Sequence, residues 1–148
     1  MNSDALWESF TRQKGISKDA RHSAWCYGSN TPDELLELTL KGVKTATASA
    51  YALYNACPDE LPRKGDYNII EDSAGNARCI IQTTVVNIVP FDKVSERQAY
   101  KEGEGDKSLE YWRGVHKTFF GLDLAQEGMS FTPDMPVVCE EFELLYTA

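Results

Sequence analysis

The sequence predicts an α+β fold built on a mainly antiparallel, barrel-like sheet. Two β-branched runs, at residues 67–71 and 77–89, are joined by a turn at Gly75 and Asn76, which is typical of a β-hairpin. A third run, residues 137–147, alternates apolar and polar side chains as a half-buried strand does. The predicted helices do not alternate with these strands as βαβ units, so a parallel, doubly wound sheet is not expected.

The first helix is expected near the N-terminus. Ser3 is a candidate N-cap, and Gly15 follows the last helical residue. The apolar face of this helix is formed by Leu6, Trp7 and Phe10. Residues 23–30 are expected to form a loop or a short extended piece.

The clearest helix signal begins at Thr31. Thr31 is a candidate N-cap, Pro32 takes the first helical position, and Glu34 would complete a capping box. Gly42 is the expected C-terminal stop.

Residues 45–56 are ambiguous, because a strand-like alternation runs into a helix-like alanine and tyrosine segment. We favour a helical turn starting near Thr45. In a helix, Lys44 and Thr47 would share one face, whereas in a regular strand they would point to opposite faces.

Two further helices are predicted in the C-terminal half. Ser95 with Gln98 forms a capping box that opens a short helix, and the glycine-rich residues 102–106 follow it. Ser108 then starts a longer helix that Gly121 is expected to end. The apolar face of this longer helix is formed by Leu109, Trp112, His116 and Phe119.

The 148 residues favour one domain, which is long enough to bury a core without metal or disulfide staples. Lys and Arg number 15 and Asp and Glu number 23, so the net charge is −8. This charge repels polyphosphates at long range, so tight binding of long nucleic acid is not expected. A small nucleoside-like ligand or a short RNA, held in a local pocket, is compatible with it.

Composition also bears on compartment and cofactors. No cysteines form a CxxC pair, no apolar signal segment opens the chain, and no apolar run approaches the length of a membrane span. We therefore expect a cytoplasmic protein with reduced thiols and no membrane partner. His22 and Cys26 have ligand-compatible spacing, but no second pair completes a zinc site, so neither a metal nor another cofactor is expected.

Lys44 and Thr47 are the first candidate site residues, because a lysine beside a hydroxyl can act as a base and nucleophile or as an anion cradle. Glu102 and Glu104 could supply a distant carboxylate. The alternatives are a solvated lysine after a helix and an acidic surface loop.

Several motifs together resemble ASCH-domain proteins, in particular the small bacterial stand-alone branch. They are Gly42-x-Lys44-Thr45-x-Thr47, Gly65-Asp66 before a strand, Glu102-Gly103-Glu104-Gly105-Asp106-x-Ser108-Leu109-x-x-Trp112, the 79–84 strand and the 135–140 ending. The resemblance runs from about Trp25 to the C-terminus. It implies a PUA-like fold, a single ASCH domain over residues 1–148 with residues 1–24 as a helical extension, and a cleft suited to RNA or a nucleoside.

One ASCH branch consists of small amidohydrolases that remove the acetyl group of 4-acetylcytidine. Carried over, its catalytic set is Lys44, Thr47 and Glu102, with Glu104 left open as the alternative carboxylate. Neutral Lys44 would take the proton of Thr47, which attacks the amide. Further substrate-binding candidates are Trp25, Tyr27, Thr45, Ser49, Glu104 and Trp112. The rival functions are an RNA-binding module and a metal-independent ribonuclease of the PUA-like class.

Overall fold

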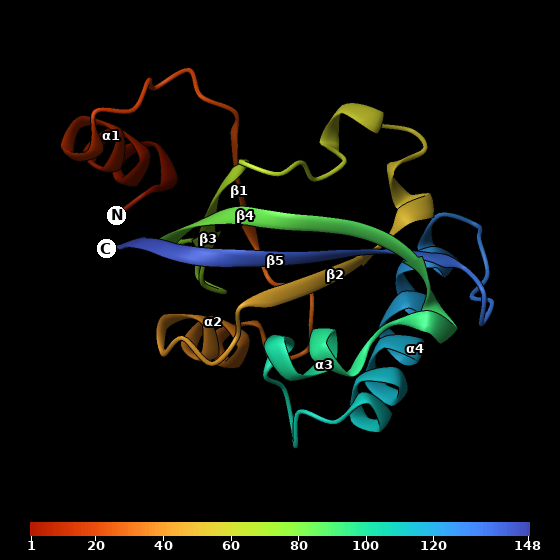
Figure 1. The fold of residues 1–148 in the computed structure, drawn as a ribbon. Helices are drawn as coiled ribbons and strands as arrows, with labels where there is room; N and C mark the ends of the chain where they lie inside the picture. Colours follow the sequence, from red (N-terminus) through yellow and green to blue (C-terminus); the bar gives the residue numbers. More distant parts are fainter.

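The computed structural model describes residues 1–148 and contains one five-stranded sheet in the order β1-β3-β4-β5-β2 (Figure 1). The strands are β1 His22–Cys26, β2 Ala46–Ala50, β3 Tyr67–Glu71, β4 Ala77–Pro90 and β5 Pro136–Thr147. β1 pairs with β3 in parallel and the other neighbours are antiparallel. The predicted α+β class with a mainly antiparallel sheet is confirmed.

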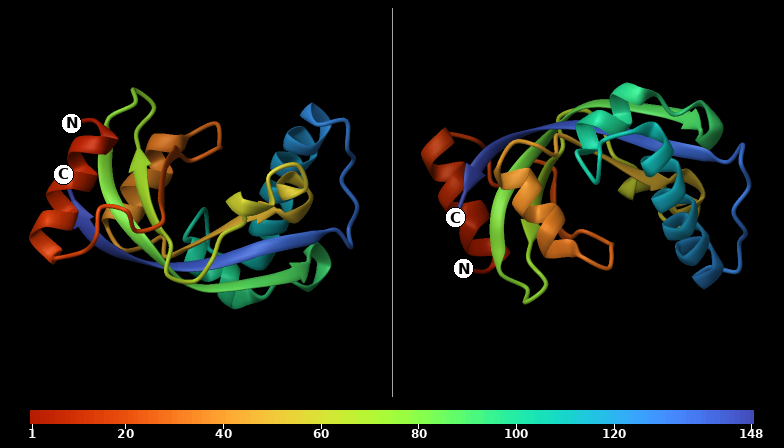
Figure 2. Two further views of the ribbon diagram at one scale, coloured as in Figure 1. Left: turned by 90° about the horizontal axis from the view of Figure 1, so that it is seen from above. Right: turned by 90° about the horizontal axis from the view of Figure 1, so that it is seen from below.

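Four α-helices surround the sheet. They are α1 Ser3–Lys14, α2 Pro32–Leu40, α3 Glu96–Glu102 and α4 Leu109–Gln126, and three short 3₁₀ segments lie at η1 Tyr51–Tyr54, η2 Pro58–Glu60 and η3 Phe91–Lys93. Figure 2 shows that the sheet is strongly curved, with α1 outside the curve and α2 and α4 facing one another across the hollow. None of the helices combines the length and the apolar character needed to cross a membrane.

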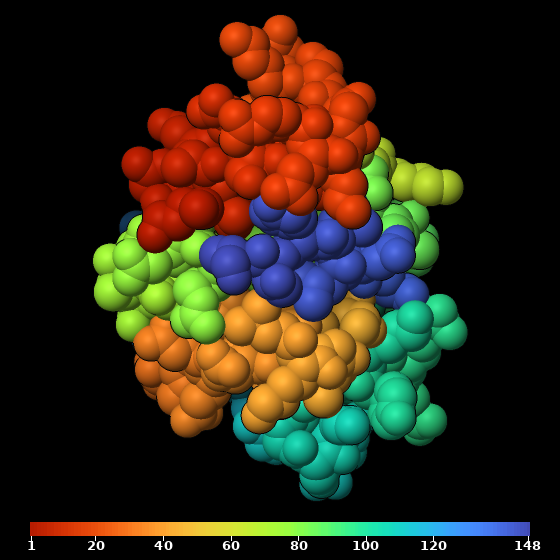
Figure 3. All heavy atoms as spheres, turned by 90° about the vertical axis from the view of Figure 1, so that its left-hand side faces the viewer, coloured from red at the N-terminus to blue at the C-terminus, as the bar shows by residue number.

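Alternation along β3 divides the core between the two faces of the sheet. Ile69 packs on the outer face with Leu6 and Phe10 of α1, whereas Ile70 packs on the inner face with Leu36 of α2. α1 also lies against the C-terminal strand, where Ser9 Oγ is 2.9 Å from the Tyr146 hydroxyl (Figure 3). A third cluster, which includes Trp112 and Phe120 of α4, closes the β2 end of the sheet.

The helical turn expected near Thr45 is wrong, because residues 46–50 form strand β2. The backbone of β2 pairs with β5, from Ala46 opposite Glu141 to Ala50 opposite Val137. This long-range pairing satisfies the backbone groups and overrides the local helix propensity of alanine. Helical structure begins only at Tyr51, as a 3₁₀ turn.

Three predicted helix ends also differ. The N-cap of α1 is Asn2, whose side chain accepts from Ala5 N–H at 2.8 Å, rather than Ser3. Thr31 precedes α2 but its side chain makes no capping bond. Gly121 lies inside α4, because the buried face continues to Leu124 and there is no reason for the helix to stop.

Candidate functional site

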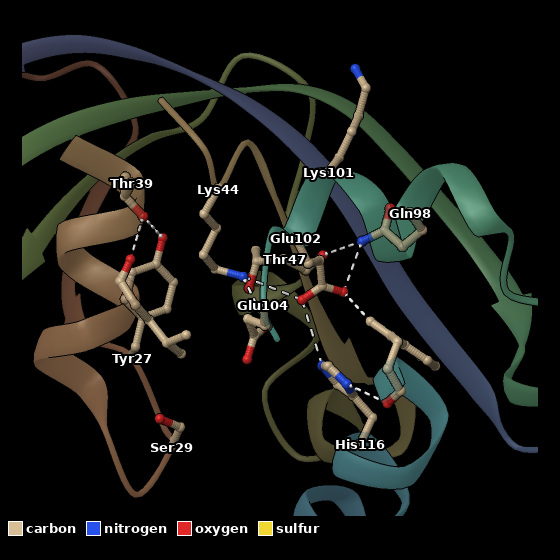
Figure 4. Close-up of polar contacts among 12 residues, drawn as sticks. Tyr27, Ser29, Thr39, Lys44, Thr47, Gln98, Lys101, Glu102, Glu104 and His116 are labelled. Atoms are coloured by element: carbon tan, nitrogen blue, oxygen red, sulfur yellow. Dashed lines mark hydrogen bonds and ion pairs between the residues drawn. The ribbon is translucent and has the colours of Figure 1, made fainter. Parts of the chain in front are cut away.

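A buried lysine, Lys44, lies at the centre of the site (Figure 4). Lys44 follows the left-handed Gly42 (φ 75°) beyond α2, and its backbone N–H donates to the Leu38 carbonyl at 3.0 Å. Its side chain is 1% exposed, and Nζ lies 3.3 Å from Glu102 Oε1 and 3.4 Å from Glu104 Oε2. A buried charge is costly unless it is paired, so these carboxylates are what keep an ammonium inside the protein.

Four side chains surround Glu102, the last residue of α3. Gln98 Nε2 (3.2 Å) and Trp112 Nε1 both donate to Oε2, while Oε1 faces Lys44 and His116 Nε2, the latter at 3.5 Å. Burial alone would raise the pKa of Glu102, but the Lys44 charge and the contacts of His116 and Trp112 lower it overall. Glu102 is therefore an ionised carboxylate fixed from several directions.

His116 of α4 completes this charged cluster. Its Nδ1 lies 2.9 Å from the Trp112 carbonyl oxygen, so Nδ1–H donates there and Nε2 faces Glu102. Burial alone would lower the pKa of His116, but the hydrogen bond and charge of Glu102 and the charge of Glu104 raise it overall. The acidic residues at 102–104 thus belong to a buried cluster of alternating charge rather than to a solvated loop.

The two chain segments that carry the cluster are held in direct contact. Thr45 N–H donates to the Lys101 carbonyl at 2.7 Å. Gly103 has φ 73°, and a Cβ at this position would lie 2.7 Å from the Val43 carbonyl oxygen. Only glycine combines this left-handed conformation with so close a backbone approach.

A pocket of about 600 Å³ opens beside the cluster, a size typical of small-ligand sites. Its floor is the inner face of the sheet, and its walls include Leu35 of α2 and both Val115 and Phe119 of α4. Trp25 and Tyr27 add aromatic surface on the β1 side.

The charged side chains that line the pocket are mainly acidic. Its carboxylates are Asp59, Glu60, Asp66, Glu102, Glu104, Asp123 and Glu140. The permanently basic side chains of the lining are Arg21 and Lys44. Both are already paired, because Arg21 Nε lies 2.7 Å from Asp66 and Lys44 pairs with Glu102. The pocket therefore repels polyanions and favours neutral or cationic ligands.

The structure brings the three residues predicted to be catalytic, Lys44, Thr47 and Glu102, to this one pocket. The hydrogen bonds of Lys44 Nζ go to Glu102 and Glu104, and none goes to Thr47. Of the predicted substrate-binding residues, those that line the pocket are Trp25, Tyr27, Ser49 and Glu104. Thr45 and Trp112 lie outside the lining, and their contacts with α3 support Glu102 from behind.

The two aromatic candidates are anchored differently. Tyr27 is buried, its hydroxyl lies 2.8 Å from Thr39 Oγ1, and Lys44 Nζ lies 5.4 Å from the centre of its ring. Trp25 is half-buried and its Nε1 donates to Asn68 Oδ1 at 2.9 Å. Trp25 is thus the more open of the two surfaces for a flat ligand.

Sequence reasoning missed Glu140 of β5. It is 8% exposed, lines the pocket, and accepts a hydrogen bond from Thr83 Oγ1 at 3.2 Å. Burial, with the charges of Asp66 and Glu102, raises the pKa of Glu140 to about 7, although the Thr83 bond acts against the shift. A signal was present in the sequence, since Glu140 falls between apolar residues of the same strand face, Val138 and Phe142.

Glu102, Glu104 and His116 also bring three metal-ligand atoms within 4.8 Å of one another. The Lys44 ammonium lies within hydrogen-bonding distance of both carboxylates. It therefore supplies the positive charge that a cation would bring, and this donor set does not call for a metal.

Comparison with known proteins agrees with the fold and the site segments. The family model of the ASCH domain matches residues 23–146. The crystal structure of protein EF3133 from Enterococcus faecalis, of the family DUF984, is 34% identical, covers 97% of this chain and 88% of its own, and has a TM-score of 0.87.

The crystal structure of an ASCH domain from Lactobacillus crispatus is 30% identical, with coverage of 96% of this chain and 95% of its own and a TM-score of 0.84. The hypothetical protein PH0355 shares the fold alone, at 17% identity, coverage of 85% and 99%, and a TM-score of 0.54. No curated protein sequence matches the chain. Since the family model spans most of the chain and the sheet and helices match those of its structural neighbours, this protein belongs to the ASCH domain family and has its PUA-like fold.

Proposed function

We propose that this protein is a small hydrolase that cleaves the amide of an acylated nucleoside of the 4-acetylcytidine type. The observation that carries the proposal is the meeting of Lys44, Thr47 and Glu102 in one pocket of about 600 Å³. They come from two segments that lie far apart in the sequence, residues 44–47 and the end of α3. A buried lysine held by carboxylates beside an accessible hydroxyl is suited to acyl transfer.

The electrostatics of the pocket support a nucleoside as the substrate rather than RNA. A phosphate group would meet the acidic side chains of the lining, and the positive charges of Arg21 and Lys44 are already balanced by the carboxylates with which they pair. A nucleoside has no charge to repel. Its base can lie against Trp25 and the apolar wall formed by Val115 and Phe119.

Thr47 is the nucleophile in this proposal. Its Oγ attacks the carbonyl carbon of the amide, and the free exocyclic amine of the base leaves. The Lys44 ammonium faces the carbonyl oxygen as negative charge develops there, because a buried donor stabilises an oxyanion more strongly than water does. Glu102 holds Lys44 in place through the 3.3 Å contact.

The test is incubation of the protein with acylated cytidine, adenosine and guanosine, each as the nucleoside and as the 5′-monophosphate, and with a short acetylated RNA. Mass spectrometry measures loss of the acyl group. We expect hydrolysis of at least one acylated nucleoside, and slower hydrolysis of its monophosphate. Thr47→Val keeps the β-branched shape and removes the hydroxyl, so it should abolish turnover.

The matched control is Thr118→Val, which makes the same change on the exposed face of α4. It should leave turnover unchanged. Retained hydrolysis in Thr47→Val would reject the nucleophile. Cleavage of the RNA strand would favour the ribonuclease, and RNA binding without any chemistry would favour the recognition module.

A further inference from the structure

The cross-strand neighbour of Thr47 carries a carboxylate. In the antiparallel pair of β2 and β5, Thr47 lies directly opposite Glu140, and both residues line the pocket. Directly opposed residues of such a pair project to the same face, with Cβ atoms roughly 4.5–5.5 Å apart. A hydroxyl and a carboxylate at that spacing can meet directly or through one water.

Glu140 accepts the last of a series of hydrogen bonds that crosses the inner face of the sheet. Ser23 Oγ and Trp25 Nε1 donate to Asn68 Oδ1, at 3.1 and 2.9 Å. Asn68 Nδ2 donates to Thr83 Oγ1 at 3.4 Å, and Thr83 donates to Glu140 Oε1 at 3.2 Å. This hydrogen bond holds Oε1 of Glu140, a residue that also lines the pocket.

Lys44 is poorly placed to accept a proton. An ammonium group has three donors and no acceptor, and this one is held by Glu102 and Glu104 at 3.3 and 3.4 Å. Its side chain is suited to stabilise negative charge. The proton of an attacking hydroxyl therefore needs another acceptor, and Glu140 is the pocket carboxylate opposite Thr47 in the strand pair.

We propose that Glu140 is the proton-accepting partner of Thr47, and that Lys44 acts as a charged stabiliser rather than as the base. The proposal rests on the hydrolase function proposed above. It changes which residue moves the proton, and it adds to the site a residue at the far end of the chain.

The reaction balances with water as the only co-reactant. Glu140 takes the Thr47 proton as Oγ forms a bond to the carbonyl carbon and the carbonyl electron pair moves to oxygen. When the pair returns, the C–N bond breaks, and Glu140 gives the proton to the leaving nitrogen. Water then attacks the Thr47 ester, loses its proton to Glu140, and releases the acid as Thr47 Oγ is reprotonated.

Several charged or titratable groups determine how Glu140 titrates. Those that face it are Asp66 with its partner Arg21, Glu102 with Lys44 and His116, and the Tyr54 hydroxyl of η1. Glu140 must be ionised to accept a proton, and its pKa of about 7 places that ionisation near neutrality. Activity is therefore expected to rise with pH through about 7.

The kinetic test compares Glu140→Gln with Glu141→Gln. The two residues are adjacent, but Glu141 pairs with Arg97 and Lys101 outside the pocket. We expect Glu140→Gln to lower kcat by at least about 100-fold, as removal of a general base does, with nucleoside affinity changed less than about threefold. Glu141→Gln should keep wild-type kcat. A Glu140→Gln variant that keeps more than a third of the wild-type kcat would overturn the proposal.

A second measurement does not need turnover. The carboxyl carbon of Glu140 is titrated by NMR in the wild type and in Thr47→Val. If the hydroxyl donates to the carboxylate, its removal raises the pKa of Glu140. An unchanged pKa of Glu140 would overturn the proposed pairing of Thr47 with Glu140, even if the enzyme is active. A raised pKa in a protein that hydrolyses none of the acylated nucleosides would support this pairing and reject only the proposed substrate.

Discussion

Replacing Glu140 by glutamine is expected to stabilise the protein at neutral and alkaline pH. The pKa of this carboxyl rises from 4.5 to about 7 in the folded state, chiefly because it is buried. Because Glu140 binds its proton more tightly in the folded state, protonation stabilises the fold. This contribution is fully present below about pH 4.5 and is lost as the pH rises through about 7. Glutamine cannot ionise, so the variant keeps its stability as the pH rises.

The size of the effect follows from the two pKa values. Ionising the buried Glu140 costs about 3 kcal/mol, because a difference of one in pKa corresponds to 1.36 kcal/mol. With 8% of the residue exposed, solvent screens this cost only slightly. For a domain of this size, about 3 kcal/mol corresponds to a rise in Tm of roughly 6–12 °C.

The assay is urea unfolding followed by tryptophan fluorescence, at about pH 4.5 and about pH 8, for wild type, Glu140→Gln and Glu141→Gln. Glu141 gives the opposite sign: hydrogen bonds from Arg97 and Lys101 lower its pKa, so its ionised form stabilises the fold. Its loss should therefore destabilise the protein at about pH 8. Parallel pH curves for wild type and Glu140→Gln would refute the reasoning.

Three further substitutions test the frame around Lys44. In the same urea assay, Gly103→Ala should lower the free energy of unfolding by about 2 kcal/mol or more, because the backbone has a positive φ there and the new Cβ meets a backbone carbonyl. The control is Gly114→Ala on α4, where the Cβ meets nothing, and it should raise the free energy of unfolding by roughly 0.5–1 kcal/mol. Trp112→Phe removes a donor to Glu102 and should cost about 1–3 kcal/mol in the same measurement. Lys44→Met removes the cation that pairs with the buried Glu102 carboxylate, so it should lower the free energy of unfolding by roughly 3–5 kcal/mol at pH 7. Thermal unfolding should show this difference shrinking below about pH 4.5, because Glu102 then becomes protonated and no longer needs the cation.

The structural features that local contacts determine were predictable from the sequence. Ser95 and Ser108 were expected to cap helices, and each side chain accepts a bond from the backbone N–H three residues later. The hairpin at Gly75 also depends only on contacts between residues that are close in the sequence. Strand β3 lies at the predicted residues 67–71, because the turn and the apolar pattern agree on its register.

The features that the sequence left open or missed depend on distant partners. Strand β1, expected as a loop or a short extended piece, forms by parallel pairing with β3, and β2, expected as a helical turn, forms because β5 lies beside it. Neither pairing is visible in a window of a few residues. The same holds for the site: Lys44 and Glu102 could be named by resemblance, but the position of Glu140 opposite Thr47 depends on the pairing of β5 with β2.

The position of β5 has a consequence for synthesis of the protein. Residues 136–147 are translated after every other strand, yet in the sheet they lie between β4 and β2. Until they leave the ribosome, β2 has no neighbouring strand and one edge of β4 stays open, and such edges invite pairing with other chains. The nascent chain is therefore expected to need protection, by the ribosome surface or a chaperone, until its last strand is inserted.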